Sequence, residues 1–186
     1  DVTKKYPVVF YVYGEPASQT AADVWGAGKT GLYAGDMAKD GYIYISMDNR
    51  GAPVPKGTVW KKAIYKNIGI INIRDQAMAT KKLLATYPFM DKDRVAVHGW
   101  SGGGSSTLNL LFQYPEIYQT GIAVAAVANQ LTYDNIYQER YMGTPFPTTD
   151  AYTKGSPITH ASKLKRKLNN IHSTVDNNVH YLNAEM

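Results

Sequence analysis

Short, almost wholly apolar runs recur along the chain and predict the strands of a sheet. The first spans residues 6–13 and is closed by Gly14. Similar runs span residues 42–47, 94–98 and 121–127. An apolar run without alternation is typical of a strand that is buried on both faces of a parallel sheet. We therefore predict a parallel sheet whose strands are buried on both faces.

Longer segments between these runs show the spacing of helices. In the clearest of them the charged positions lie off one apolar stripe, which is formed by Ile70, Ile73, Ala77 and Leu84. We expect this helix to stop at Tyr87, because the residue before a proline is disfavoured in a helix. A second apolar segment, residues 108–112, also reads as a helix. This alternation predicts an α/β fold, with a mostly parallel sheet and flanking helices.

The length of 186 residues suits one globular domain, and no repeat or linker marks a second. No apolar run approaches the roughly 20 residues that a membrane-spanning helix needs, and the first residues lack the apolar core of a signal peptide. The chain has no cysteine, which excludes disulfides, thiolate metal sites and cysteine nucleophiles.

The net charge of +5 comes from 20 lysines and arginines against 15 acidic residues. Only residues 163–167 concentrate it, and we interpret that run as a solvated face rather than a nucleic-acid surface. The four histidines are scattered, so we expect no metal. We also expect no cofactor. The run 26–30 looks like the end of a phosphate-binding loop, but Asp23 stands where that pattern needs glycine.

The strongest chemical signal is a G-x-S-x-G pattern at residues 99–103, between a predicted strand and a predicted helix. Such a turn presents a serine hydroxyl at its strained tip, and side chains on Gly99 or Gly103 would clash. The amide of Gly102 then points to the place where an oxyanion forms, at a helix N-terminus. Ser101 is therefore the candidate nucleophile.

A serine nucleophile needs an acid and a histidine, which follow it in that order in this architecture. Asp176, in a loop after a predicted strand at residues 167–171, is the candidate acid. Three alternatives remain open: Asp91, Asp134 and Asp150. Of these, Asp134 is expected to cap a helix, while Asp91 and Asp93 are expected in the turn before the nucleophile strand. No histidine is suitably placed as the base, and we interpret all four as structural: His98, His160, His172 and His180.

Five motifs stand in one order along nearly the whole chain, at residues 11–16, 48–51, 99–104, 139–143 and 172–180. Together they resemble the catalytic domain of the prolyl oligopeptidase family, and most of all its dipeptidyl peptidase IV-like branch. The resemblance implies an α/β-hydrolase fold that is truncated at both ends. Residues 1–186 would then be a partial catalytic domain without the family's N-terminal β-propeller.

The resemblance also assigns roles to individual residues. Ser101 matches the nucleophile and Asp176 the acid, while the hydroxyl of Tyr13 joins the Gly102 N–H in the oxyanion hole. Asn178 matches the amide that holds a substrate carbonyl. Four residues match the small apolar pocket for the residue before the cut bond, and these are Val127, Tyr133, Tyr137 and Val179. Arg140 matches a residue near the next substrate side chain.

These roles imply a serine exopeptidase that releases N-terminal dipeptides, Xaa-Pro or Xaa-Ala, from a peptide substrate. The catalytic histidine would lie some tens of residues beyond Met186, so the 186-residue chain alone is expected to be inactive. The resemblance favours a periplasmic or secreted protein and a homodimer formed through the missing segments. Two alternatives stay open. One is another α/β-hydrolase activity, such as an acylaminoacyl peptidase, an endopeptidase or an esterase, and the other is a non-catalytic interaction domain.

The chain departs from the family pattern at three places near this site. Glu15 stands where the family usually has glycine, and Gln130 where an aromatic pocket wall is common. Gly102 replaces a bulkier, often aromatic residue and is expected to widen the pocket. Together these changes weaken the expected preference for proline. Asn169 and Asn170 are also unexpected, since they fall in a strand that should be buried.

Overall fold

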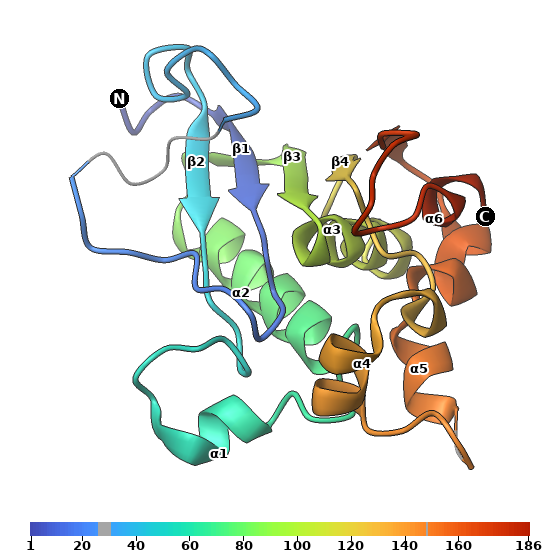
Figure 1. Ribbon diagram of the computed structural model, residues 1–186. Helices are drawn as coiled ribbons and strands as arrows, with labels where there is room; N and C mark the ends of the chain where they lie inside the picture. Colours follow the sequence, from blue (N-terminus) through green and yellow to red (C-terminus); the bar gives the residue numbers. More distant parts are fainter. Residues whose placement is uncertain (26–30, 148) are drawn as a thin grey trace.

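The computed structural model describes residues 1–25, 31–147 and 149–186, so the run 26–30 lies outside the described residues. Five parallel strands form one sheet in the order β2-β1-β3-β4-β5 (Figure 1). The strands are β1 Tyr6–Tyr11, β2 Ile43–Ser46, β3 Met90–Trp100, β4 Thr120–Val124 and β5 Lys167–Ile171. The predicted α/β fold with a parallel sheet and flanking helices is confirmed.

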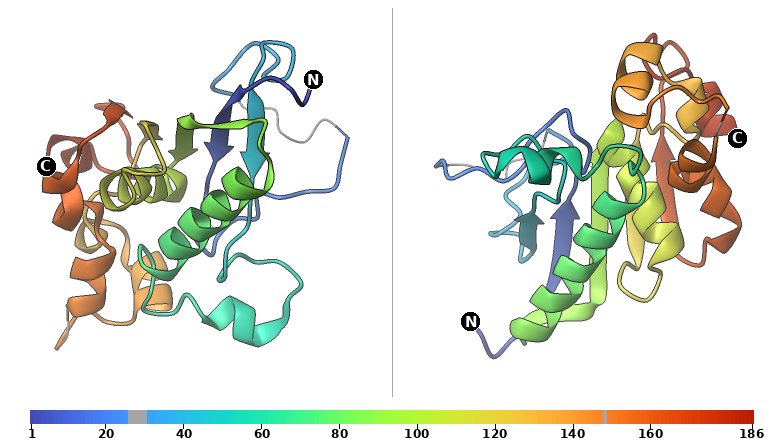
Figure 2. Two further views of the ribbon diagram at one scale, coloured as in Figure 1. Left: turned by 180° about the vertical axis from the view of Figure 1, so that it is seen from behind. Right: turned by 90° about the horizontal axis from the view of Figure 1, so that it is seen from below.

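The helices connect these strands or follow them. They are α1 Gly57–Lys62, α2 Ile71–Thr86, α3 Gly102–Gln113, α4 Asn135–Met142, α5 Asp150–Gly155 and α6 Leu182–Glu185, with short 3-10 helices η1 Gln130–Thr132 and η2 Pro157–Lys163. Helices α2 and α3 pack beside each other on the sheet (Figure 2). Their apolar residues join those of β1 and β3 in one core that includes Val8, Phe10, Ile73, Val97 and Leu110.

The strands are less buried than an unbroken apolar run predicts. In β1, Val8 and Phe10 are buried, whereas Val9 and Tyr11 are only half-buried. The expectation of burial on both faces is therefore wrong for this strand, because α2 and α3 pack on the face that holds Val8 and Phe10. Strand β5 is an edge strand and mostly exposed, so its two asparagines face solvent and need no buried partner.

Several boundaries differ from those expected. Strand β3 begins at Met90, so Asp91 and Asp93 lie within the strand and not in a turn before it. Strand β4 ends at Val124, because Ala125 has a φ of 46°, outside the range of extended backbone. Helix α3 begins at Gly102, well before the apolar segment that predicted it, whereas α2 stops before Tyr87 as expected.

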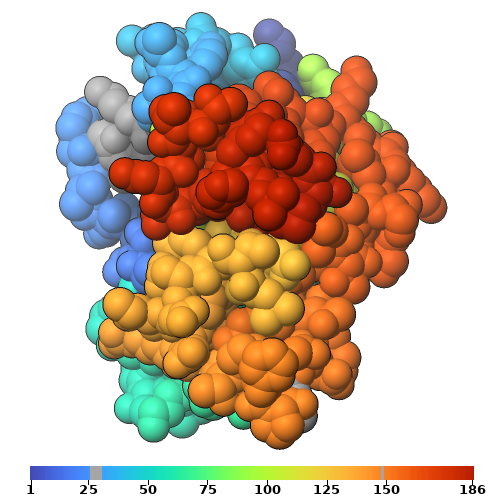
Figure 3. Space-filling view, turned by 45° about the vertical axis from the view of Figure 1, so that its right-hand side comes forward, coloured from blue at the N-terminus to red at the C-terminus, as the bar shows by residue number. Residues whose placement is uncertain are grey.

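All five strands run in parallel, so the loops after their carboxyl ends meet at one edge of the sheet. The segment after β5 turns back over this edge and packs against the segment around η1, red on yellow in Figure 3. The quoted motifs are therefore brought together here from distant parts of the chain. Within the described ranges, no helix combines the length and apolar character needed to cross a membrane.

Candidate active site

Ser101 lies at a sharp turn between β3 and α3. Its φ is 57° and its ψ is −119°, a conformation that costs a non-glycine residue of the order of 1–3 kcal/mol. The Ser101 N–H donates to the carbonyl of Val124 at 2.9 Å, which ties the turn to the end of β4. The Ser101 carbonyl accepts the N–H of Ser105 at 3.0 Å and so begins the hydrogen bonding of α3. This strained turn is the expected geometry for an exposed nucleophile.

The two outer glycines of the G-x-S-x-G pattern are required by the backbone around them. A Cβ atom on Gly99 would collide with the carbonyl oxygens of Val12 and Gly103. A Cβ atom on Gly103 would likewise collide with the carbonyl of Val12. Because the obstacles are backbone atoms, no rotamer change can relieve them. Strand β1, the turn and α3 therefore pack with no room for a side chain.

The loop after β1, residues 13–16, approaches the same turn. Ser106 on α3 donates its hydroxyl to the carbonyl of Tyr13 at 2.9 Å. Asn49 donates its side-chain amide to the carbonyl of Gly14, also at 2.9 Å. Burial raises the pKa of Tyr13, and the nearby Glu15 carboxyl raises it further. The Tyr13 phenol therefore stays protonated and able to donate a hydrogen bond.

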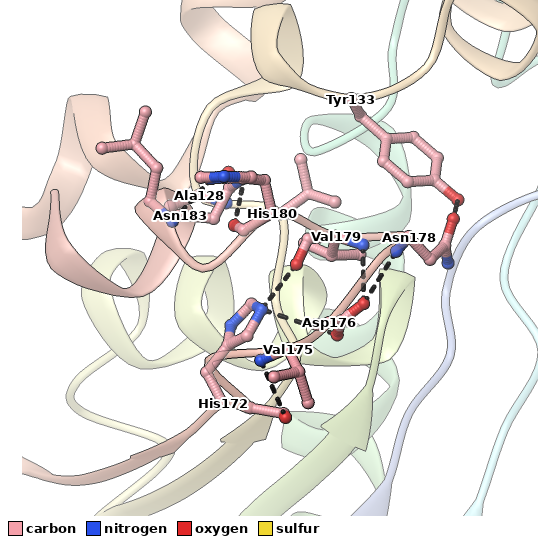
Figure 4. Close-up of polar contacts among 12 residues, drawn as sticks. Ala128, Tyr133, His172, Val175, Asp176, Asn178, Val179, His180 and Asn183 are labelled. Carbon is pink, nitrogen blue, oxygen red and sulfur yellow. Dashed lines mark hydrogen bonds and ion pairs between the residues drawn. The ribbon is translucent and has the colours of Figure 1, made fainter.

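The Asp176 carboxylate is held by its own loop (Figure 4). Its Oδ1 accepts the backbone N–H groups of Asn178 and Val179, each at 2.9 Å. These two bonds lower the pKa of Asp176, so the group is ionised at neutral pH. The ring of His172 completes the loop, with Nε2 at 2.7 Å from the Val179 carbonyl and at 3.6 Å from Asp176 Oδ2.

A tyrosine wall connects the acid loop to α4. The Tyr133 hydroxyl donates to Asn178 Oδ1 at 3.1 Å. Its ring meets that of Tyr137 edge to face, with 5.5 Å between the centroids. The structure thus brings together three of the residues expected to bind substrate. The remaining two of the expected pocket, Val127 and Val179, are both buried, and Val127 donates its N–H to Ser105 of α3 at 2.9 Å.

Glu15 lies between this wall and the serine turn. It is only 5% exposed, and Tyr137 donates its hydroxyl to Glu15 Oε2 at 2.6 Å. An ideal Cβ atom on Gly102 would lie 2.6 Å from the same oxygen. The expectation that Gly102 widens the pocket is therefore wrong at this point, because the Glu15 side chain fills the space that a residue larger than glycine would occupy. Burial raises the pKa of Glu15 to about 7.

Arg140 is connected to the tyrosine wall through Tyr141, whose ring meets that of Tyr137 at 4.9 Å between the centroids. It is exposed and stacks on the ring of Tyr141, at 5.5 Å from the ring centroid. Both residues line a cavity of about 640 Å³, which also includes Lys61, Lys62 and Pro16. Pro16 follows Glu15 in the chain, so this basic cavity adjoins the loop that carries Tyr13.

The four histidines each bond to groups other than Ser101. Nε2 of His98 lies 3.2 Å from the Tyr44 hydroxyl, and burial lowers the pKa of His98. His160 bonds to a carbonyl near α5, and His180 accepts a backbone N–H of α6. His172 bonds to the acid loop itself. Among the described residues, no group of three or more histidine, aspartate and glutamate side chains could hold a metal ion.

Sequence reasoning missed the residues that support the loop of Tyr13. Asn49 is 4% exposed, and besides Gly14 it bonds to the carbonyl of Arg50 and accepts the amide of Gln76 at 3.0 Å. Arg50 in turn forms an ion pair with Asp75 at 2.6 Å. Asn49 and Arg50 belong to the motif at residues 48–51, so the sequence did indicate them. The motif supports the loop of Tyr13 and does not contribute a reacting group.

Comparison with known proteins adds independent findings. The model of the prolyl oligopeptidase family matches residues 33–186. A probable dipeptidyl-aminopeptidase B from Arthroderma otae is 36% identical over 185 residues, which are 98% of this chain and 20% of that protein. Dipeptidyl peptidase 8 from Homo sapiens is 35% identical over 186 residues, again 98% of this chain and 20% of that protein.

Solved structures show the same likeness. The crystal structure of Porphyromonas gingivalis dipeptidyl peptidase 4 matches all of this chain and 26% of its own, with a TM-score of 0.89 and 33% identity. The chain thus spans about a fifth of the curated relatives that it matches and about a quarter of this solved chain.

Proposed function

The chain belongs to the prolyl oligopeptidase family, and from that premise we propose that it is part of the catalytic domain of a serine exopeptidase. The enzyme would remove a dipeptide, Xaa-Pro or Xaa-Ala, from the N-terminus of a peptide. One observation carries the proposal. Ser101 has a φ of 57° at the start of α3, and the loops of Tyr13 and Asp176 lie at the same edge of the sheet.

The reaction begins with attack of Ser101 Oγ on the carbonyl carbon after the second residue, while a histidine takes its proton. The peptide C–N bond then breaks, and the histidine protonates the departing amine. The dipeptide is left as an ester on Ser101. Water hydrolyses this ester with the same histidine as base, which releases the dipeptide and restores the serine.

Two donors would stabilise the oxyanion that forms at each step. The Gly102 N–H is at the N-terminus of α3, where the helix dipole favours negative charge. The Tyr13 hydroxyl, whose pKa is raised, is the second donor. Because Ser106 and Asn49 hold the loop of Tyr13, the phenol needs little reorganisation when charge develops.

Asp176 would orient the histidine and stabilise its charged form. The bonds of the four histidines in the chain do not suit them as the base, and the relatives are about five times longer than the matched region. We therefore propose that the base is supplied by residues outside these 186. The residues that hold the free amine of the substrate, and any dimer contact, are proposed to lie there as well.

The polar contacts of Asn178 suit the binding of a substrate carbonyl. Its Oδ1 accepts the Tyr133 hydroxyl, so the amide is oriented and its Nδ2 is left to donate. Two buried valines and the tyrosine wall would supply the compact apolar lining that a pyrrolidine ring requires. The valines are Val127 and Val179.

The proposal is tested with the full-length protein that contains these residues. We expect hydrolysis of Gly-Pro-p-nitroanilide and covalent labelling by a fluorophosphonate, both lost in Ser101→Ala. Ser162→Ala, which changes an exposed serine, is the matched control and should keep both. Labelling that persists in Ser101→Ala would contradict the assignment of the nucleophile.

Blocking the substrate amine separates the remaining alternatives. A dipeptidyl peptidase loses activity on N-acetyl-Gly-Pro-p-nitroanilide, whereas an acylaminoacyl peptidase or endopeptidase keeps or gains activity on blocked substrates. A folded protein that neither reacts with the fluorophosphonate nor hydrolyses any of these substrates would instead be the non-catalytic interaction domain.

A further inference from the structure

Glu15 and Gly102 are two departures from the family pattern that the structure unites. The Cδ atom of Glu15 would lie 2.7 Å from an ideal Cβ on Gly102, and its Oε2 2.6 Å away. A side chain on residue 102 would therefore require the Glu15 carboxyl to move from this position. Where the family has a bulky side chain after the nucleophile, this site has a carboxyl group that comes from the loop after β1.

This carboxyl group has unused hydrogen-bonding capacity. Tyr137 is its one hydrogen-bond donor among the described residues, and no salt bridge to Glu15 is found in that part of the chain. A carboxylate can accept about four hydrogen bonds, and a protonated carboxyl can also donate one. A buried polar group with spare capacity favours a ligand that supplies the missing partner.

A second polar group stands where the family commonly has an aromatic pocket wall. Gln130 is 1% exposed, and its Oε1 accepts the amide of Gln138 at 2.6 Å. Within the part of the chain that the structure describes, its own Nε2 has no hydrogen-bond partner, and neither has Oε1 of Gln138. Tyr133 and Tyr137 lie between these two glutamines in the chain. Spare polar capacity is therefore found both at Glu15 and in the segment that carries the tyrosine wall.

The position of Glu15 limits the length of the side chain it can meet. Its Oε2 lies beside Gly102, the residue next to the nucleophile, and consecutive Cα atoms are about 3.8 Å apart. Because the acyl residue would be bonded to Ser101, we expect a group one or two bonds beyond its Cβ to approach this carboxyl. The Tyr137 hydroxyl already occupies one side of Oε2, which leaves less room for the longer stem of lysine or arginine.

We propose that Glu15 determines specificity, and that the pocket for the residue before the cut bond accepts a small side chain with a hydroxyl group, as in serine, threonine or hydroxyproline. The hydroxyl would bond to the free oxygen of Glu15. This inference rests on the proposed peptidase function and concerns the substrate class of the same site. Proline, which has no donor, would leave that oxygen unpaired.

The test compares two substrates that differ by one hydroxyl, Ala-Ser-p-nitroanilide and Ala-Ala-p-nitroanilide, on the full-length protein. The measured quantity is the ratio of their kcat/KM values in the parent, in Glu15→Met and in Glu15→Gln. Because one hydrogen bond is worth about 0.5–1.5 kcal/mol, we expect the ratio to fall by roughly 3- to 10-fold in Glu15→Met. Glu15→Gln keeps a hydrogen-bond acceptor of similar size, so its ratio of kcat/KM values should stay close to that of the parent.

The controls separate this inference from the function on which it rests. Glu116→Gln, at an exposed acid, should leave the ratio unchanged. Fluorophosphonate titration gives the active fraction of each variant, so a folding defect cannot imitate a change in ratio. An equal ratio in the parent and Glu15→Met would overturn the role of Glu15. If the parent hydrolyses none of these substrates and also fails to hydrolyse Ala-Pro-p-nitroanilide, the peptidase function itself is overturned, and the role of Glu15 with it.

Discussion

Nε2 of His172 lies 2.7 Å from the carbonyl of Val179 and 3.6 Å from Asp176 Oδ2. A backbone carbonyl can only accept, so Nε2 carries the hydrogen and donates it to Val179. This nitrogen is therefore occupied within the acid loop. His172 positions the loop instead of taking a proton from the nucleophile, and it does so from within the 172–180 motif.

Replacing His172 should loosen the carboxylate without removing it. We expect His172→Ala to lower kcat by roughly 10- to 100-fold with a smaller change in KM, because small misplacements of a catalytic group are costly. His160→Ala is the control, since that ring also bonds to a backbone carbonyl but lies at η2. The measurement is steady-state kinetics of the full-length protein. An unchanged kcat in His172→Ala would show that His172 does not position the acid loop.

Tyr13→Phe should remove one donor from the oxyanion hole and leave the ring in place. The loss of such a donor typically costs about 10²–10³ in kcat. We expect KM to change little, since the hydroxyl acts mainly on the charge that develops during the reaction. Tyr42→Phe, on an exposed ring just before β2, is the comparison. A fall in affinity with kcat preserved would assign Tyr13 to substrate binding instead.

Asn49→Ala should weaken the support of the Tyr13 loop. The change leaves the Gly14 carbonyl and the Gln76 amide without this partner. A buried polar group left unpaired costs about 1–3 kcal/mol, so both stability and kcat should fall. Thermal unfolding and kinetics measure the two effects. Asn169→Ala, on the exposed β5, should alter neither.

Gly102 and Glu15 should respond to mutation as a coupled pair. Gly102→Tyr alone forces a ring against the Glu15 carboxyl, and overpacking of this kind costs about 1–3 kcal/mol. Adding Glu15→Gly vacates the space, so the double variant should recover stability and activity on Ala-Pro-p-nitroanilide. A double-mutant cycle measures the coupling. Effects that simply add would show that the two side chains do not share the space.

Glu15 should also make stability depend on pH. Burial raises the pKa of Glu15 from 4.5 to about 7, so the folded state favours the protonated form. Below pH 4.5 the group is protonated in both the folded and unfolded states and has no effect. As pH rises toward 7 only the unfolded state ionises, and the free energy of unfolding falls by up to about 3 kcal/mol.

The measurement for this prediction is the difference in unfolding free energy between the parent and Glu15→Gln. Because other carboxyl groups titrate equally in both proteins, the difference isolates Glu15. We expect the parent to lose stability relative to Glu15→Gln between about pH 4.5 and 7, with no further change above. A difference that is constant over this range would show that Glu15 is not buried as an acid.

The sequence by itself determined the fold class and the nucleophile turn. Apolar runs and helical stripes depend on neighbours in the chain, so they predicted four of the strands and a helix that begins near Ile70 and stops at Tyr87, which is observed at Ile71–Thr86. The pattern around Ser101 is equally local, because the collisions that demand Gly99 and Gly103 follow from a strand that turns directly into a helix. The bonding of Asp134 to the N–H of Tyr137, a helix cap, was predictable for the same reason.

Only the tertiary structure decided how the pocket is filled. Glu15 and Tyr137 are 122 positions apart, and no local pattern indicates that their side chains bond at 2.6 Å. The glycine at position 102 suggested a wider pocket, yet the space is occupied by Glu15 from the loop after β1. The exposure of β5 was also hidden, because burial depends on which strands and helices lie alongside and not on the strand's own residues.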